Sequence, residues 1–266
     1  MNSYETPLVL FTVFSQLSVG MVALSAVHLF AGPEPPPEKI RSEWLVAGGV
    51  LLAGMIASVF HLGHPEGMVR ALSHLGSAWL SREALSVGVF LGLVVVGIVL
   101  MRQKTNRGLI ILTALVGLLA LFAMGMTYSP PSFPAINNVL PFVFFVITAA
   151  LLGSSVGTLF APEAKKPLVN RIFTVSLIVG LVLYLIVPCV WLSGGEVIRQ
   201  TGQSWLASLL YWARIIVGLV LPLIVVWVTK KTPVWLWVLV LAGELMGRAL
   251  FFANTVHTAT NMGGVY

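Results

Sequence analysis

Long apolar stretches separated by short polar connections run through the whole sequence. A helix needs about 20 apolar residues to cross the hydrocarbon core of a bilayer. The stretches do not alternate between apolar and polar residues, as the strands of a transmembrane barrel do. The pattern therefore predicts an all-α integral membrane protein, an eight-transmembrane-helix bundle that forms a single domain over residues 1–266. The expected spans are about 8–30, 44–60, 84–101, 108–128, 139–160, 172–192, 206–228 and 234–253.

Composition agrees with a protein whose solvent is the lipid bilayer. Hydrophobic residues make up 58% of the chain and charged residues 9%, whereas soluble domains carry about 25% charged residues. The net charge of +6 does not indicate a nucleic-acid partner, because the basic residues lie in short connections between spans. The single cysteine, Cys189, excludes an iron–sulfur cluster held by this chain, since such clusters normally need four thiolates.

Basic residues are strongly biased to one side of the predicted bundle. The side that follows the second, fourth and sixth spans holds only Arg70, Arg82 and Arg199 in its connections. Because basic connections stay on the cytoplasmic side, we expect both termini on the outer face, together with residues 60–83. The ten basic residues of the other side are Lys39, Arg41, Arg102, Lys104, Arg107, Lys165, Lys166, Arg171, Lys230 and Lys231.

Three further patterns predict how the helices pack. The eight tryptophans fall at span ends, which favours interfacial belts at both membrane surfaces; they are Trp44, Trp79, Trp191, Trp205, Trp212, Trp227, Trp235 and Trp237. Close helix packing is expected at pairs of glycines four residues apart, which are Gly88/Gly92, Gly153/Gly157 and Gly243/Gly247. Pro188 and Pro222 lie inside spans six and seven, and we expect them to kink these helices.

Candidate chemistry concentrates in the polar segment between spans two and three, residues 60–83, which holds three of the five histidines. His61 changes charge near neutral pH, which suits proton-coupled chemistry. Glu83 stands at the start of span three, where an acid also suits a helix N-terminus. For His64 and His74 we prefer the interpretation of solvated loop side chains.

Three more charged residues fall within spans, where charges are costly and usually face the protein interior or a partner. Glu244 and Arg248 are four residues apart, so they are expected either to neutralise each other on one helix face or to line a pocket. Arg214 is expected either to reach the outer headgroups or to join that pocket. With His61 and Glu83, all of these groups occupy the outer half of the bundle.

Haem ligation is not expected, because two axial histidines must lie at matching depth on facing helices. His28, at the inner end of span one, has no partner at its depth. Only His61 and His257 match in depth, and neither lies well inside a span.

Residues 61–65, HLGHP, followed eighteen residues later by Glu83 within WLSRE, resemble the anchor subunit (DmsC) family of anaerobic dimethyl sulfoxide reductases. Residues 7–14, PLVLFTVF, and residues 243–248, GELMGR, are also similar to that family. The resemblance covers the whole chain in length and span count. It implies an eight-span protein of the bacterial inner membrane, with both termini periplasmic, that binds no haem and oxidises menaquinol. It also implies two partners, an iron–sulfur electron-transfer subunit and a molybdopterin catalytic subunit.

The resemblance assigns roles to individual residues. The family's functional histidine matches His61, and its acidic residue matches Glu83. Many relatives carry an arginine where this chain has Gly67, whereas Arg70 matches arginines of some relatives. In this interpretation His61 accepts a proton from the quinol, and Glu83 serves as a proton relay or as an orienting carboxylate. The remaining predicted quinol-binding residues are Arg70, Arg82, Arg214, Glu244 and Arg248.

Because the sequence shows no ligand set for a redox centre, we expect the electrons to pass to the iron–sulfur partner, and we do not expect this chain to act on the terminal acceptor. Three alternatives stay open. The first is an ion- or proton-coupled transporter that uses Glu244. The second is a purely structural anchor. The third is an anchor for a polysulfide, tetrathionate, selenate or N-oxide reductase.

Overall fold

The described structure consists of helices joined by turns and irregular segments. A computed structural model describes residues 5–31, 34–60 and 72–261, and within these ranges every regular element is a helix. Eight of these helices are long and apolar enough to cross a membrane, which confirms the expected number. They are α1 (Thr6–Phe30), α2 (Pro37–Val59), α3 (Trp79–Leu100), α4 (Arg107–Thr127), α5 (Leu140–Gly157), α6 (Lys166–Leu192), the composite α8–η3–α9 (Leu209–Thr229) and α10 (Leu236–Asn254).

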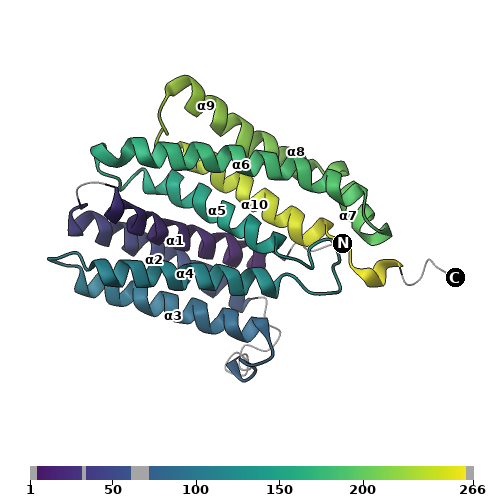
Figure 1. The fold of residues 1–266 in the computed structure, drawn as a ribbon, viewed down its shortest axis with the longest axis horizontal. Helices are drawn as coiled ribbons and strands as arrows, with labels where there is room; N and C mark the ends of the chain where they lie inside the picture. Colours follow the sequence, from purple (N-terminus) through teal and green to yellow (C-terminus); the bar gives the residue numbers. More distant parts are fainter. Residues whose placement is uncertain (1–4, 32–33, 61–71, 262–266) are drawn as a thin grey trace.

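The eight helices lie side by side along the long axis of the molecule (Figure 1). α1 and α5 are central, since 72% of the apolar window of each is buried, against 28% for α3. α1 packs against α2, α4, α5 and α10, while α5 also packs against α4, α6 and α10. The bundle therefore consists of two halves, α1–α4 and α5–α10, that meet mainly where α1 contacts α5.

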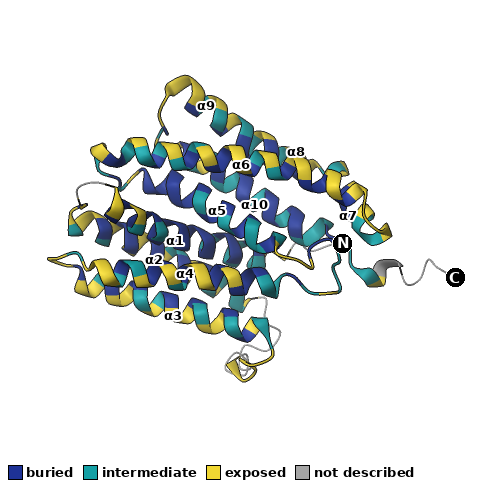
Figure 2. Cartoon of the chain, viewed as in Figure 1, coloured by how far each residue is buried: buried dark blue, intermediate teal, exposed yellow. Residues whose placement is uncertain are grey.

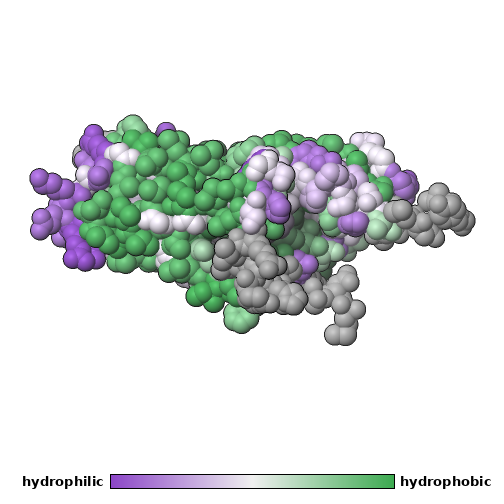
Figure 3. Space-filling view, turned by 90° about the horizontal axis from the view of Figure 1, so that it is seen from below, coloured by the Kyte–Doolittle hydropathy of each residue, from purple (hydrophilic) through white to green (hydrophobic). Residues whose placement is uncertain are grey.

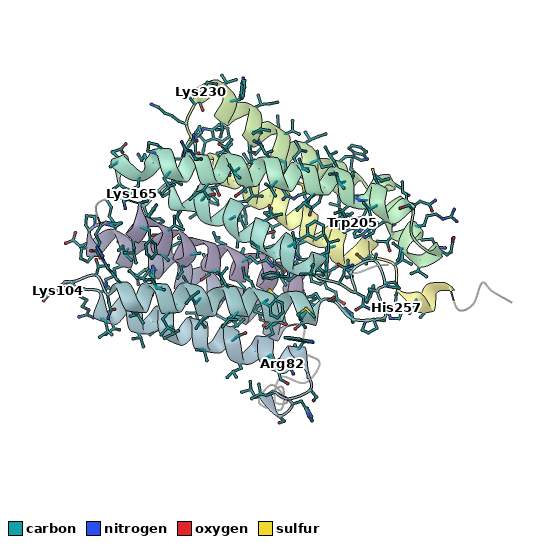
Figure 4. All side chains as sticks on the ribbon, in the orientation of Figure 1. Arg82, Lys104, Lys165, Trp205, Lys230 and His257 are labelled. Carbon is teal, nitrogen blue, oxygen red and sulfur yellow. The ribbon has the colours of Figure 1, made fainter. Side chains whose placement is uncertain are left out.

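The two ends of the bundle differ in the residues that they carry. α1 begins, α3 begins and α10 ends at one end, which also carries Arg82 and His257 (Figures 1 and 4). We call it the Glu83 end. Lys104, Lys165 and Lys230 lie at the opposite end (Figure 4), which we call the lysine end.

Apolar side chains cover the sides of the bundle. Exposed residues lie on the outward faces of the helices, whereas the inward faces are buried (Figure 2). Leu119 is 62% exposed, Leu100 60% and Val190 60%. On the face drawn in Figure 3, apolar residues cover the middle and hydrophilic residues gather at the left-hand end. An apolar surface of this extent is stable only when lipid covers it, and every backbone group there must be bonded within a helix.

Glycine allows the central helices to approach closely. A Cβ added at Gly20 of α1 would overlap the Ala149 carbonyl group of α5, and a Cβ added at Gly153 would overlap the backbone of Gly20. The backbones of α1 and α5 are thus in direct contact. This contact confirms the close packing expected from Gly153.

The other two glycine pairs differ in outcome. Gly243 of α10 faces the backbone of Gly218, which lies in the π-helical turn η3 (Ile216–Val220). Gly88 and Gly92 have nothing within 4 Å of an added Cβ. The packing prediction is therefore confirmed for Gly243 and wrong for the pair in α3, whose glycines face away from the neighbouring helices.

Several helices extend into the expected connections. α2 begins at Pro37 instead of near residue 44, because proline has no N–H to lose in the first turn of a helix. α3 begins at Trp79, before the expected residue 84, so Glu83 lies one turn inside the helix. A further helix, α7 (Glu196–Ala207), occupies most of the expected connection after α6.

The expectation of tryptophan belts is wrong for three of the eight tryptophans. Trp44 and Trp205 are 0% exposed and Trp191 is 5% exposed, so all three lie inside the protein. Trp44 donates a hydrogen bond to Ser25 of α1 at 3.2 Å. The Trp205 and Trp191 rings pack edge to face at 4.9 Å between centroids. Neighbouring helices therefore cover these rings and separate them from the lipid.

Span seven departs from regular α-helical geometry. The π-helical turn η3 separates α8 (Leu209–Ile215) from α9 (Leu221–Thr229), and Pro222 follows that turn directly. Proline lacks the N–H that continues the α-helical hydrogen-bond ladder, which accounts for a change of register at this point. α6 runs through Pro188 as a single helix.

Candidate functional site

A buried carboxylate lies at the Glu83 end of the bundle. Glu83, in the second turn of α3, is 3% exposed, and its Oε2 atom has no hydrogen-bond partner among the described residues. The Thr127 hydroxyl at the end of α4 lies beside this carboxyl group. That hydroxyl also lies 3.0 Å from the Ala123 carbonyl oxygen, and its one proton serves only one of the two acceptors. Glu83 is therefore a buried acid with too few hydrogen bonds. Such a group lowers stability, so a functional role is the natural explanation for it.

Tyr128, the residue that follows α4, lies near the Glu83 carboxylate. Burial of the phenol raises the pKa of Tyr128 well above its ordinary value, and the neighbouring Glu83 carboxylate raises it further. The phenol therefore keeps its proton at neutral pH and remains a hydrogen-bond donor. Its ring packs edge to face on Phe145 and Phe252, at 5.9 and 5.3 Å between centroids. Arg248 also lies within electrostatic reach of Tyr128, which connects this site to the bundle interior.

Arg82 holds the turn that leads into α3. Its Nε donates to the Leu75 carbonyl oxygen at 2.9 Å, and its Nη2 donates to the Gly76 carbonyl oxygen at 2.8 Å. The guanidinium group also lies over the Trp79 ring, 4.3 Å from the centroid. Arg82 thus fixes the backbone of the turn that precedes Glu83.

Other predicted residues of the polar segment lie outside the described residues. These are His61, His64, Gly67 and Arg70. The described part of the sequence stops at Phe60 and resumes at Leu72, seven residues before α3 begins. His257 is described, and its ring packs edge to face on Phe133 at 4.8 Å.

A second polar cluster lies in the bundle interior around Glu244. Its Oε1 accepts a hydrogen bond from Nη2 of Arg214, and its Oε2 accepts one from the Thr148 hydroxyl at 2.7 Å. Arg214 is 1% exposed and Glu244 3% exposed. The expectation that Arg214 reaches the outer headgroups is therefore wrong. Its side chain turns inward because Glu244 and the Tyr184 ring, 5.0 Å from the guanidinium carbon, offer it partners there.

Arg248 joins the two halves of the bundle. Its Nη2 donates to Oε1 of Gln16 in α1 at 2.8 Å, and its guanidinium group lies over the Phe145 ring at 4.0 Å. The expectation that Glu244 and Arg248 neutralise each other on one helix face is therefore wrong, because they do not form an ion pair. Each of the two side chains is bonded to a different helix instead.

The cavity beside this cluster is small. It is lined by Thr148, Tyr184, Arg214, Glu244 and Arg248, and its volume is about 10 Å³. This is close to the ~10–15 Å³ that one water molecule needs, and far below the volume of a quinol ring. Nε and Nη1 of Arg214 and Nε of Arg248 have no protein partner among the described residues. One water molecule in the cavity matches this set of donors.

At the lysine end, α1 and α2 hold a cluster that sequence reasoning missed. Ser25 donates to Oε2 of Glu43 at 2.8 Å, and Lys165 donates to the carbonyl oxygen of His28. Glu43 and His28 are each 3% exposed. The predicted spans placed Glu43 in a connection, whereas it belongs to α2. Its spacing from the buried residues Ile40 and Ala47 would have revealed it as an inward-facing residue.

The eight apolar helices and their apolar outward faces define a multi-pass membrane protein, with the buried acid Glu83 at one end of the bundle. Across the described ranges, no three His, Cys, Asp or Glu side chains gather closely enough to hold a metal ion. A family model described as "DMSO reductase anchor subunit (DmsC)" matches residues 1–253. The protein belongs to this family of membrane anchors, as its resemblance in sequence implied.

Curated relatives carry the same family name. The C subunit of the anaerobic dimethyl sulfoxide reductase of Haemophilus influenzae is 31% identical over 170 residues, which are 61% of this sequence and 61% of that relative. The aligned part thus spans less than two thirds of the H. influenzae protein. The YnfH and C subunits of the anaerobic dimethyl sulfoxide reductases of Escherichia coli are each 25% identical, over 275 and 283 residues. These two alignments cover 94% of this sequence and 94% of the relatives.

Proposed function

We propose that this protein is the menaquinol-oxidising membrane anchor of a molybdopterin-containing reductase of the dimethyl sulfoxide type. It would reside in the bacterial inner membrane with both termini in the periplasm, as the bias of basic residues favours. The Glu83 end would then face outward and carry the iron–sulfur partner, which in turn holds the catalytic subunit. The observation that carries this proposal is the buried, incompletely bonded Glu83 carboxylate in a protein of the DmsC family.

The chemistry requires proton acceptors close to the quinol. Menaquinol oxidation releases two electrons and two protons and leaves menaquinone. His61 would accept the first hydroxyl proton, and Glu83 would accept or relay a proton from the same ring. The free Oε2 of Glu83 supplies an acceptor that no described side chain occupies. Tyr128, which keeps its proton, would donate a hydrogen bond to a ring oxygen. Both electrons would leave to the iron–sulfur partner, because the single cysteine of this chain does not suffice for a cluster of its own.

Position decides which polar groups belong to the quinol site. We propose that Glu83 lies at the site, that Arg70 and Arg82 set the potential at its entrance, and that the interior cluster supports it from behind. Arg214, Glu244 and Arg248 are bonded within the protein, and the cavity beside them has room for about one water molecule. These side chains would therefore fix the wall behind the site without contacting the quinol ring.

Glu244 is poorly suited to carry an ion or a proton through the membrane. Both of its carboxylate oxygens already accept hydrogen bonds, one from a buried arginine. A transported ion would have to displace that arginine. The bonding of Glu244 thus favours a quinol-oxidising anchor over a transporter.

The test compares variants of the complete reductase complex in membranes. We expect Glu83→Gln to lower menaquinol-driven turnover by about 10²-fold or more, the usual effect of removing a positioned base. The carboxamide keeps the shape of the side chain, so the quinol analogue HOQNO should still bind. His61→Arg should lose both turnover and HOQNO quenching.

The control is Glu163→Gln, an exposed acid at the lysine end that pairs with Lys166 at 2.5 Å. It should leave quinol-driven turnover unchanged. Turnover from reduced viologen, which bypasses the quinol, should be unchanged in every variant and shows that the complex is assembled. Full quinol-driven turnover in Glu83→Gln would remove Glu83 from the mechanism.

A further inference from the structure

A groove between α6 and α9 opens on the side of the bundle near the lysine end. It is lined by Asn170 and Thr174 of α6, by Leu223, Val226 and Trp227 of α9, and by Lys230. Its volume is about 190 Å³, more than ten times the ~10–15 Å³ that one water molecule needs. This groove is larger than the cavity beside Glu244, and the proposed quinol chemistry at the other end does not use it.

The polar end of the groove presents hydrogen-bond donors. The Thr232 hydroxyl donates to Oδ1 of Asn170 at 2.7 Å, which leaves the NH₂ of that amide available to a ligand. Nζ of Lys230 lies over the Trp227 ring, 4.4 Å from the centroid, and this contact holds the ammonium group beside the groove. The ion pairs of the described residues join other side chains, so no described acidic side chain pairs with Lys230.

Lys230 occupies an unusual backbone position that fixes its direction. It caps α9 with φ 55°, and it is the one residue other than glycine with a positive φ among those described. This left-handed residue ends α9, and glycine is the usual choice there. Lys230 therefore lies at the boundary between α9 and the turn that follows.

The rest of the groove is apolar and faces the membrane. Leu223 and Val226 line the stretch of α9 that precedes its capped end. Trp227 is 73% exposed, as is typical of a tryptophan at the membrane interface. Donors therefore lie at the interface and apolar walls lie deeper, which is the order of phosphate and acyl chain in a phospholipid. Lys231 and Arg171 add positive charge at the same end.

We propose that this groove binds one anionic phospholipid. Lys230 and the Asn170 amide would hold the phosphate, and Leu223, Val226 and Trp227 would hold the first part of an acyl chain. Basic pockets between helices at a membrane surface select anionic headgroups by charge, at about 1 kcal/mol for each lysine. Such a lipid would fasten α9, the segment that follows the π-helical turn, to α6.

The test uses the full-length protein purified in detergent and titrated with phosphatidylglycerol or with phosphatidylcholine of the same acyl chains. Native mass spectrometry measures the lipid that each variant retains. The wild type should retain one phosphatidylglycerol molecule in preference to phosphatidylcholine. Lys230→Gln should weaken that retention about fivefold, the equivalent of one lysine contact. Asn170→Leu should weaken it as well.

Lys104→Gln is the matched control, because Lys104 is an exposed lysine at the same end that does not line the groove. It should retain lipid as the wild type does. Equal losses in Lys104→Gln and Lys230→Gln would show general surface attraction and overturn the proposal, as would equal binding of the two lipids by the wild type. Thermal unfolding without added lipid checks that each variant is folded. Lys230→Gln, on an exposed turn, decides the outcome if Asn170→Leu is unstable.

Discussion

Removing the charge of Glu244 should destabilise the bundle strongly. In Glu244→Gln the amide can still accept from Thr148, but Arg214 keeps its charge at 1% exposure without a counter-ion. The lost contacts include a charged hydrogen bond, and hydrogen bonds to charged groups contribute about 1.5–3 kcal/mol each. Breaking a buried pair by removing one partner typically costs about 3–5 kcal/mol. We expect the free energy of unfolding to fall by that amount.

A second substitution separates charge from shape. Arg214→Met combined with Glu244→Gln removes both charges and should recover most of the loss, because a buried pair contributes little over an apolar replacement. Equilibrium unfolding in mixed detergent–SDS micelles, followed by tryptophan fluorescence, measures each variant. Glu196→Gln, in an exposed pair with Arg199 at 2.6 Å, should show no measurable loss. A loss below about 1 kcal/mol in Glu244→Gln, or a double variant as unstable as the sum of its parts, would refute the buried-charge argument.

Two further outcomes can be checked on the same protein. Gly20→Ala should lower the free energy of unfolding by about 1–3 kcal/mol, because the new Cβ overlaps the backbone of α5. Gly88→Ala, which has open space around the new Cβ, should be neutral or slightly stabilising. Similar losses of stability in both variants would contradict the close contact of α1 and α5. Gln200 and Arg199 donate hydrogen bonds to Glu196 and hold its pKa below the ordinary value of 4.5. Their contribution to the stability of α7 is therefore present at neutral pH and is lost as the pH falls through the lowered pKa. The protection of the α7 amides, measured as the exchange rate relative to the intrinsic rate at the same pH, should fall on acidification in the wild type. In Glu196→Gln this protection should not change with pH, and an equal fall in both proteins would refute the role of Glu196.

The number and type of the helices could be predicted from the sequence, because the length of each apolar run is a local property. The partner of a buried charge could not. Glu244 and Arg248 lie one turn apart on α10, but Glu244 pairs with Arg214 and Arg248 with Gln16, because the fold brings α8 and α1 against these two side chains. The same limit applies to Trp205, whose position near a span end does not reveal that protein covers it on all sides.

The candidate site was accessible to sequence reasoning in part. Glu83 was identified from its place beside the histidine motif, and its burial is a property of the fold. The expected span of 84–101 places Glu83 at the start of a helix, where an acid suits the helix N-terminus. The observed start of α3 at Trp79 moves Glu83 one turn inward, against Thr127 of the next helix. A shift of a few residues in a boundary thus changes a surface acid into a buried one.

The interior cluster sets the order in which the bundle can be completed during synthesis. α10 is the last of the spans, and it supplies both Glu244 and Arg248. Domains and helices emerge from the ribosome in sequence order, N-terminal first. Until α10 enters the membrane, Arg214 has no counter-ion and Gln16 of α1 lacks its arginine. The incomplete bundle therefore carries an uncompensated buried charge, which is costly in a bilayer. Insertion of the final helix neutralises that charge and ties the newest segment to the oldest one.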